Sequence, residues 1–349
     1  MREEPGIARE KLRACLQEQY GLTPAKIDFL PVGQDTNAGV YRVVSEQGPA
    51  YLLKIKSGLF YAPGCIVPRY LCDQGIASVV APLPTKTKAL WTQAGEWTVI
   101  TYPYLEGDTG WTGMTDEHWK LVGGISKRVH EAVLPAAGVD GLRRESFDPS
   151  GYARSIENVE IQLATSEDGG GKPERALRRS WAKHRSTIYA LLTSLDKLSG
   201  VLRSQSDPHV ICHADLHPGN LLRNRAGQVF VVDWDDVMLA PKERDFIFVG
   251  EPVDGSAQHG GSPFFQRYGQ AEIDWIALTY YRYERVVQDL IEYAQQVILR
   301  EDLGEETKAR AVRAFDANPK GRNMDAAQVA AGRISPQLTI EGIRRDDNR

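Results

Sequence analysis

Long hydrophobic runs are absent from this sequence of 349 residues. No apolar stretch approaches the roughly 20 residues that a membrane-spanning helix needs, so we expect no membrane partner. The N-terminal segment Met1-Arg2-Glu3-Glu4-Pro5 is charged and lacks the apolar centre of a secretory signal peptide. Together these absences predict a cytoplasmic protein.

Cysteine is also scarce, and the few cysteines have no recognisable spacing. Cys15, Cys65, Cys72 and Cys212 form no C-x-x-C pair and no set of metal ligands. This pattern favours reduced, packed thiols over a disulfide framework or a zinc site.

A strong charge of either sign is likewise missing. The formal net charge of −4 gives no reason to expect nucleic acid as a partner, and no obligate protein partner is evident. Hydrophobic residues make up 42% of the chain, which is enough to bury a real core in two domains or one large bilobal unit.

The periodicity of the apolar residues changes along the chain. After an amphipathic helix at residues 8–20, the first hundred residues are rich in strand patterns, and the later residues are mainly helical. Strands are expected at residues 26–32, 40–44, 51–55, 88–91 and 97–102, and helices at 66–74, 115–131, 152–165, 176–202 and 273–300. We therefore predict an α+β protein with an N-terminal lobe at residues 1–105, a helical C-terminal lobe at 106–332 and a flexible tail at 333–349.

The segment HADLHPGN at residues 213–220, followed by VVDWD at residues 231–235, carries most of the chemical information. It places Asp215 and Asn220 five positions apart on one loop, and Asp233 directly after an apolar strand. These groups suit Mg²⁺-dependent phosphoryl transfer, with Asp215 as the base and the other two as metal ligands. Singly, such residues more often cap turns. The combination of all three favours the catalytic interpretation.

Two lysines of the early strand YLLKIK are candidates for holding nucleotide phosphates. Lys54 and Lys56 lie on the same face of the strand because side chains alternate. We favour Lys54, since Lys56 directly precedes a Ser-Gly turn. Thr36 and Asn37, in a polar turn between two strands, could touch the β- and γ-phosphates, although an ordinary hairpin turn explains them equally well.

The connector between the two predicted lobes, residues 102–107, is a candidate for binding adenine. Pro103 can offer a carbonyl but no N–H group, and Leu105 can offer the N–H group. A simple interdomain linker is the alternative, and both interpretations can hold at once.

The later part of the chain is rich in acidic and aromatic residues that could contact a cationic acceptor. The candidates are Asp235, Tyr281 and Glu284. The alternatives are a solvated helix face for the acids and core packing for the tyrosine. We interpret His213 and His217 as structural anchors of the loop.

The HADLHPGN and VDWD segments resemble the aminoglycoside phosphotransferases, a branch of the protein-kinase-like fold. Choline, homoserine and other small-molecule kinases share this motif. Four further segments are similar to the spectinomycin phosphotransferases, and the similarity runs from about Leu12 to Asp316. They are DTNA at 35–38, DWDD at 233–236, MLAPKERD at 238–245 and YYRYER at 280–285.

The resemblance implies a bilobal protein-kinase-like fold with a small antiparallel-sheet N-lobe and a larger, mainly helical C-lobe. It also implies that ATP and Mg²⁺ are cofactors and that the γ-phosphate moves to a hydroxyl group of spectinomycin, a cationic aminocyclitol antibiotic. The matching positions are Asp215 for the base, Asn220 and Asp233 for Mg²⁺, Lys54 and Thr36 for the phosphates, and Pro103 and Leu105 for adenine.

One departure from the kinase pattern concerns Lys54. Kinases pair this lysine with a glutamate on the following helix, but no acidic residue lies between Ser57 and Cys72. Asp233 or the phosphate itself could take the place of that partner. The alternatives to an antibiotic kinase are a kinase of another small hydroxylated metabolite or aminoglycoside (choline-, homoserine- or hygromycin-type) and a non-catalytic nucleotide-binding protein.

Overall fold

A computed structural model of the chain describes residues 4–33, 37–134, 139–165, 171–205, 208–249, 262–269, 271–300 and 303–338. Contacts between Cα atoms divide the chain into two compact units. The sheet unit comprises Met1–Arg144, Val210–Leu239 and Pro263–Gly269, and the helical unit comprises Glu145–His209, Ala240–Ser262 and Gln270–Arg349. The predicted lobe boundary at residue 105 and the predicted tail stay predictions.

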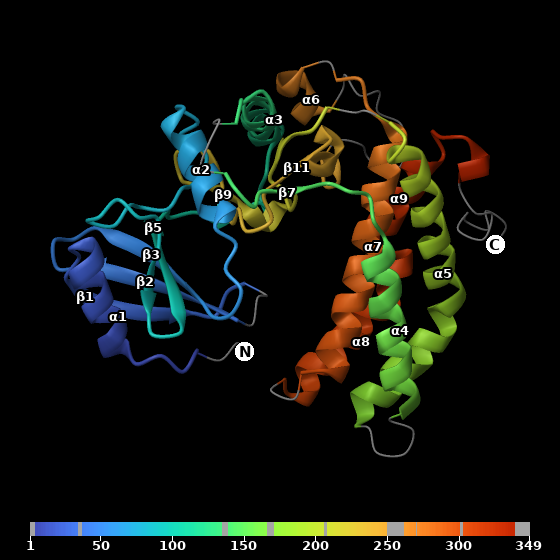
Figure 1. Ribbon diagram of the computed structural model, residues 1–349, viewed down its shortest axis with the longest axis horizontal. Coiled ribbons are helices and arrows are strands. Elements are labelled where there is room, and N and C mark those ends of the chain that lie inside the picture. The colour runs from blue at the N-terminus through green and yellow to red at the C-terminus, as the bar shows by residue number, and fades with distance from the viewer. Residues whose placement is uncertain are drawn as a thin grey trace. The chain divides into compact units, whose positions relative to one another are not determined.

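The sheet unit is built on a five-stranded antiparallel sheet (Figure 1). The strand order is β1 (Pro24–Leu30), β2 (Ala38–Ser45), β3 (Ala50–Lys56), β5 (Trp97–Pro103) and β4 (Thr92–Ala94). One face packs its aliphatic and aromatic side chains under α1 (Arg9–Cys15) and the π-helical turn Leu16–Tyr20. Since side chains alternate along a strand, burying Leu53 and Ile55 places Lys54 and Lys56 on the opposite face.

The strand expected at residues 88–91 is wrong, and β4 begins at Thr92 instead. Lys88 has a φ of 68°, in the left-handed region, and its N–H group donates to the carbonyl oxygen of Thr85 at 2.9 Å. A residue in that conformation closes a turn and cannot extend a strand.

Two small sheets and several helices complete the sheet unit. One sheet has the order β10 (Val229–Val231), β9 (Leu221–Arg223), β6 (Asp108–Thr109), and the other β7 (Arg143–Arg144), β11 (Met238–Ala240), β8 (Val210–Cys212). The helices are α2 (Pro63–Asp73), α3 (Asp116–His130), the 3₁₀ turn Pro218–Asn220 and α6 (Pro263–Tyr268). Helices α3 and α6 pack so closely that a Cβ atom on Gly123 would lie 2.1 Å from the carbonyl oxygen of Phe264.

The helical unit is arranged around α7 (Trp275–Ile298), which packs against four neighbouring helices (Figure 1). These are α4 (Ser150–Thr165), α5 (Lys172–Leu202), α8 (Glu305–Ala317) and α9 (Arg322–Ala331), and 3₁₀ turns lie at Lys242–Phe246, Asn318–Lys320 and Pro336–Leu338. Asp274 caps α7 by accepting the N–H groups of Ile276 and Ala277. Among the described residues, no helix combines the length and apolar character that crossing a membrane requires.

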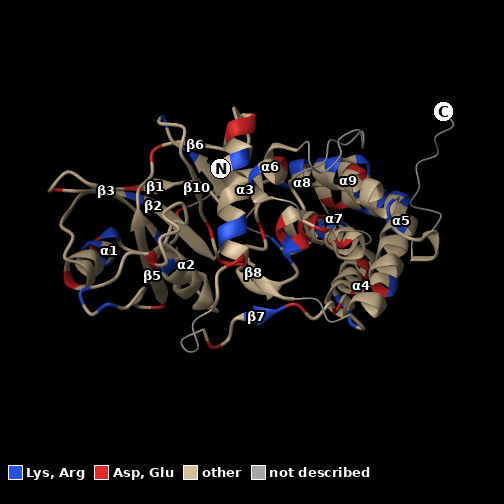
Figure 2. Cartoon of the chain, turned by 90° about the horizontal axis from the view of Figure 1, so that it is seen from above, with Lys and Arg blue, Asp and Glu red and all other residues tan. Residues whose placement is uncertain are grey.

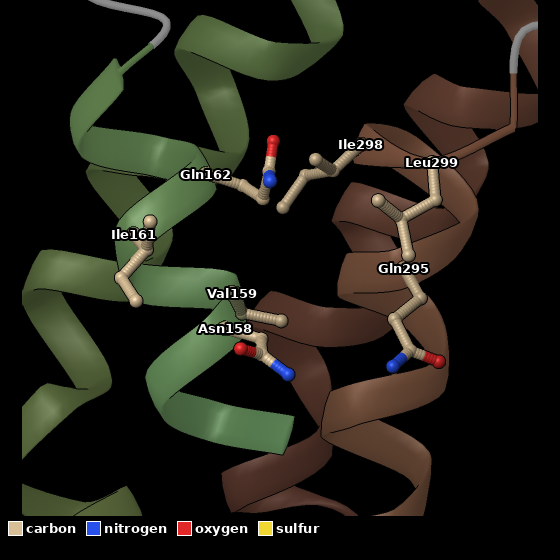
Figure 3. Close-up of a pocket in the computed structure, with 7 residues that line it drawn as sticks. All are labelled: Asn158, Val159, Ile161, Gln162, Gln295, Ile298 and Leu299. Carbon is tan, nitrogen blue, oxygen red and sulfur yellow. The ribbon is translucent and has the colours of Figure 1, made fainter. Parts of the chain in front are cut away.

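The helical unit carries a mostly basic helix and more than one surface pocket. Basic residues outnumber acidic ones along α5 (Figure 2). A pocket of about 230 Å³ lies between α4 and α7 (Figure 3), lined by Asn158, Val159, Ile161, Gln162, Gln295, Ile298 and Leu299. Its lining is aliphatic and amide, without a titratable side chain, so it offers no group for proton or phosphoryl transfer.

Candidate active site

A histidine, His213, anchors the loop that follows β8. The Nε2 atom of His213 donates to the carbonyl oxygen of Val232 at 2.9 Å, and its Nδ1 atom accepts the N–H group of Asp215 at 3.3 Å. The ring also packs edge-on against Trp234, with centroids 4.7 Å apart. These contacts join the loop to the segment that follows β10.

Asn220 and Asp215 are held together across this loop. The Nδ2 atom of Asn220 donates to the backbone carbonyl of Asp215 at 2.9 Å and lies 3.3 Å from its Oδ2 atom. The backbone N–H group of His217 donates to the same carbonyl at 2.8 Å. Because the amide nitrogen of Asn220 is engaged, its Oδ1 atom is the part of the side chain that can accept or ligate.

A strand pairing joins the backbone just before Asp233 to the backbone of Asn220. Leu221 of β9 is paired with Val231 of β10, and the N–H group of Val232 donates to the carbonyl oxygen of Asn220 at 3.0 Å. The Asp233 side chain is 48% exposed, so it has room for a ligand.

Two residues of the site have left-handed backbone conformations. Ala214 has a φ of 69° and Asp233 a φ of 62°. Such conformations cost on the order of 1 kcal/mol or more for a residue with a Cβ atom, less for Asp than for Ala. Asp215 directly follows Ala214, so local backbone strain lies at or next to both acids.

Lys54 and Lys56 reach from β3 to the acids that follow β10. The Nζ atom of Lys54 donates to Oδ1 of Asp233 at 2.7 Å and to Oδ2 of Asp235 at 2.8 Å. The Nζ atom of Lys56 donates to the same oxygen of Asp235 at 2.7 Å. Asp235 therefore bridges the two lysines.

The electrostatics of this cluster favour the charged forms. Burial alone raises the pKa of the Asp235 carboxyl, but the ammonium groups of Lys54 and Lys56 outweigh it and lower that pKa to about 2. Burial lowers the pKa of Lys54, but the carboxylates of Asp233 and Asp235 raise it by more. The pKa of Lys54 therefore lies above its ordinary value. Lys54 thus stays a cation.

Helix α2 supplies no acidic partner for Lys54, but its first turn packs against the segment that does. A Cβ atom on Gly64 would lie 3.2 Å from the carbonyl oxygen of Trp234 and 3.3 Å from Cα of Asp235. Burial raises the pKa of the neighbouring Cys65 thiol to about 12, so this thiol stays protonated. The acid that kinases place on the helix is thus supplied here from the segment after β10.

Of the remaining predicted nucleotide contacts, Asn37 and Pro103 lie at the ends of strands of the five-stranded sheet. Asn37 is exposed, and its carbonyl oxygen accepts the N–H group of Ser57 at 2.8 Å, which ties the start of β2 to the end of β3. Thr36 lies outside the described residues. Pro103 is the exposed last residue of β5, and Leu105 is half-buried just beyond it.

Two predicted substrate residues lie on α7 in the helical unit. Tyr281 is fully buried, and Glu284 is 5% exposed. Glu284 accepts hydrogen bonds from Arg244 and, at 2.9 Å, from Tyr152. Burial raises its pKa even though Arg244 opposes the shift. Packing of this kind favours a structural role for both residues over contact with a substrate.

The donor set suits a hard divalent cation. A carboxylate on Asp233 and an amide oxygen on Asn220 are the oxygen ligands that Mg²⁺ accepts, with water and phosphate completing its coordination. The exposed carboxylate and the orientation imposed on the amide both agree with such a role. Asn220 and Asp233 would hold the ion.

Comparisons with known proteins identify the family and the fold of this chain. The model of the phosphotransferase enzyme family (APH) matches residues 28–281. The crystal structure of spectinomycin phosphotransferase APH(9)-Ia with ADP and spectinomycin aligns with a TM-score of 0.81 and 28% identity, covering 94% of this chain and 98% of that one. Its AMP-bound complex aligns with a TM-score of 0.77 and 26% identity, covering 95% and 100%. The protein StrN of Streptomyces griseus is 24% identical over 71% of this chain and 76% of its own length.

These findings confirm the predicted kinase-like fold and the predicted enzyme class. Sequence reasoning missed the double contact of Asp235 and the contact between His217 and Asp215. The i, i+2 spacing of both the lysines and the acids was the available signal for the first. Since the family match spans most of the chain, this protein belongs to the phosphotransferase enzyme family, whose members are kinase-like enzymes that phosphorylate hydroxyl groups with ATP.

Proposed function

We propose that this protein is a cytoplasmic kinase that uses ATP and Mg²⁺ to phosphorylate a hydroxyl group of spectinomycin or a closely related aminocyclitol antibiotic. The observation that carries the proposal is the alignment with spectinomycin phosphotransferase bound to ADP and spectinomycin, which extends over 94% of this chain. Phosphorylation of this kind would inactivate the antibiotic.

The proposed mechanism begins with the acceptor hydroxyl at Asp215. The carboxylate orients the hydroxyl and takes its proton while the oxygen forms a bond to the γ-phosphorus of ATP. The bond from that phosphorus to the bridging oxygen breaks, and ADP leaves with the electron pair. Since the transition state is loose, the contribution of Asp215 is mainly positional and needs no raised pKa.

The lysine pair supports the nucleotide in this mechanism. Lys54 directs its ammonium group toward the phosphates, and Asp235 holds that group at 2.8 Å. Mg²⁺, held by Asn220 and Asp233, would neutralise the charge that develops on the phosphate oxygens. Pro103 and Leu105 bind the adenine edge, and the turn containing Thr36 and Asn37 contacts the terminal phosphates.

The acceptor is expected to be a cation. Spectinomycin carries two amines that are protonated near neutral pH, and the exposed carboxylates of the site attract such a molecule. The side chain of Asp215 is 27% exposed and that of Asp233 is 48% exposed. The charge of Asp235 is neutralised by Lys54 and Lys56, so this residue attracts the cationic acceptor less strongly than the sequence alone predicted.

The direct test is mass spectrometry of spectinomycin after incubation with the protein and Mg-ATP. We expect one added phosphate, dependent on the acceptor, on ATP and on the metal. A parallel panel of hygromycin, choline and homoserine, assayed by ADP release, measures selectivity. Efficient turnover of another acceptor with none of spectinomycin would replace the proposed substrate while keeping the kinase assignment. ATP turnover that no acceptor stimulates would count against both.

A further inference from the structure

A histidine of the catalytic loop is held in one orientation by its neighbours. The Nδ1 atom of His217 accepts the N–H group of Gly219 at 2.9 Å, so in the neutral ring the proton resides on Nε2. That Nε2 atom lies 3.4 Å from Oδ2 of Asp215. The distance is longer than a strong hydrogen bond, as is common for catalytic contacts before the substrate binds.

The ring of His217 is also held by packing. The indole of Trp111 stacks on it, with centroids 5.5 Å apart and planes inclined by 22°. A Cβ atom on Gly219 would lie 2.5 Å from Cε1 of His217 and 2.8 Å from Nε1 of Trp111. Only glycine fits that position without displacing the two rings, so the loop, the histidine and the tryptophan form one packed group.

We propose that His217 is a positioning residue that orients the carboxylate of Asp215 for the acceptor hydroxyl. This inference rests on the function proposed above and deepens it. Two N–H groups approach the Oδ2 atom of Asp215: Nε2 of His217 at 3.4 Å and Nδ2 of Asn220 at 3.3 Å. Holding that oxygen directs the other one, Oδ1, toward the reacting hydroxyl.

The physical effect is on the rotation of the carboxylate. The terminal torsion of an aspartate is broad and has no strong intrinsic preference. One donor leaves the plane of the carboxylate free to turn, whereas two donors on one oxygen restrict it. Because a displacement of about 1 Å at a reacting group can cost about 10²-fold in rate, such a restriction matters to kcat. The stacked indole of Trp111 limits rotation of the His217 imidazole.

Two substitutions separate the role of the Nε2 proton from the role of the ring. H217F keeps an aromatic ring for Trp111 but removes the donor, and H217Q keeps an N–H donor near the Nε2 position but removes the ring. We expect H217F to lower kcat by about 10- to 100-fold with little change in the KM for ATP, and H217Q to lower kcat by a clearly smaller factor. The reverse order would show that only stacking matters and would overturn the proposal.

Coupling to Asp215 gives a second kinetic readout. In a D215N background the loss caused by H217F should nearly disappear, because residues that act as a unit are not additive. A full additional loss in that background would mean that His217 acts without Asp215, and the proposal would be abandoned.

A spectroscopic measurement tests the inference independently of the substrate. Ring-nitrogen chemical shifts of ¹⁵N-histidine-labelled full-length protein, assigned by comparison with H217Q, should show Nε2 protonated and Nδ1 unprotonated. A ring protonated on Nδ1 alone would contradict the proposal even if the enzyme proved to use another acceptor. Failure to phosphorylate spectinomycin, with the expected tautomer present, would instead affect only the proposed function.

Discussion

The Nζ atom of Lys54 lies 2.8 Å from Oδ2 of Asp235, a residue 181 positions further along the chain. Kinases commonly pair this strand lysine with a glutamate on the next helix, and α2 contains no glutamate. Asp235 supplies the carboxylate from the segment that also carries Asp233. It holds Lys56 as well, at 2.7 Å, so the two lysines share one acid.

The pairing of Lys54 with Asp235 is testable through nucleotide affinity. D235N keeps the shape of the side chain but removes its charge, so Lys54 loses one of its two carboxylate partners. We expect the KM for ATP to rise by about tenfold or more, since a hydrogen bond to a charged group is worth about 1.5–3 kcal/mol. The matched control is D236N, because Asp236 is 57% exposed and forms an ion pair with Arg143 at 3.4 Å instead of with a lysine of β3. Equal effects of the two substitutions would disprove the assignment.

Asp215 should affect the chemical step and leave nucleotide binding intact. D215N retains the size of the side chain and loses the ability to accept a proton. We expect kcat to fall by about 10²- to 10⁴-fold, as is usual for a lost general base, while the affinity for ATP measured by calorimetry stays within about twofold. Wild-type turnover by D215N would rule out its role as the base.

Asp233 should show the opposite pattern. Its carboxylate is 48% exposed and is proposed to ligate Mg²⁺ on the nucleotide. D233N should weaken binding of Mg-ATP, measured by calorimetry, by about tenfold or more, and should reduce the difference between titrations with and without Mg²⁺. If both titrations matched those of the wild type, the metal assignment would be incorrect.

The backbone of Ala214 makes a prediction about stability. Its φ of 69° disfavours any residue with a Cβ atom, so A214G should raise the free energy of unfolding by about 0.5–1 kcal/mol. The matched control is A153G at an exposed position of α4, where glycine should lower stability by about 1 kcal/mol. Urea unfolding of the two variants should give shifts of opposite sign, and a loss in both would show that residue 214 is not strained.

The contact between α5 and α8 predicts a pH dependence of stability. Asp316 accepts hydrogen bonds from Lys183 at 2.8 Å and His184 at 2.9 Å, which lower its pKa from 3.8 to about 2. A lowered pKa stabilises the folded state above about pH 4, and this stabilisation is lost as the pH falls toward about 2.

The size of this effect is limited by solvent, since the side chain of Asp316 is 40% exposed. We expect D316N to lose less than about 1 kcal/mol of stability at about pH 6 and a smaller amount at about pH 3. Urea unfolding at the two pH values measures the difference between the variant and the wild type. A constant difference would mean that the charge of Asp316 contributes nothing.

Local sequence patterns predicted most of the helices and strands, because such elements depend on residues that are close in the sequence. Alternation in β3 placed Lys54 and Lys56 on one face, and helical periodicity located α7. The error at residues 88–91 has a local cause as well, because a non-glycine residue in the left-handed region leaves little trace in the sequence.

The sequence alone determined the chemistry of this protein: a loop with an acid and an amide five positions apart, a second acid after an apolar strand, and a lysine on an early strand. Tertiary structure decided which of these groups meet. The pairing of Lys54 with Asp235 and the contact between His217 and Asp215 depend on how strands and loops pack and on which ring nitrogen carries a proton. Lys54 and Asp235 are 181 positions apart and leave no periodicity to read, and Asp215 and His217 meet only because the loop turns tightly between them, so only the folded arrangement reveals these contacts.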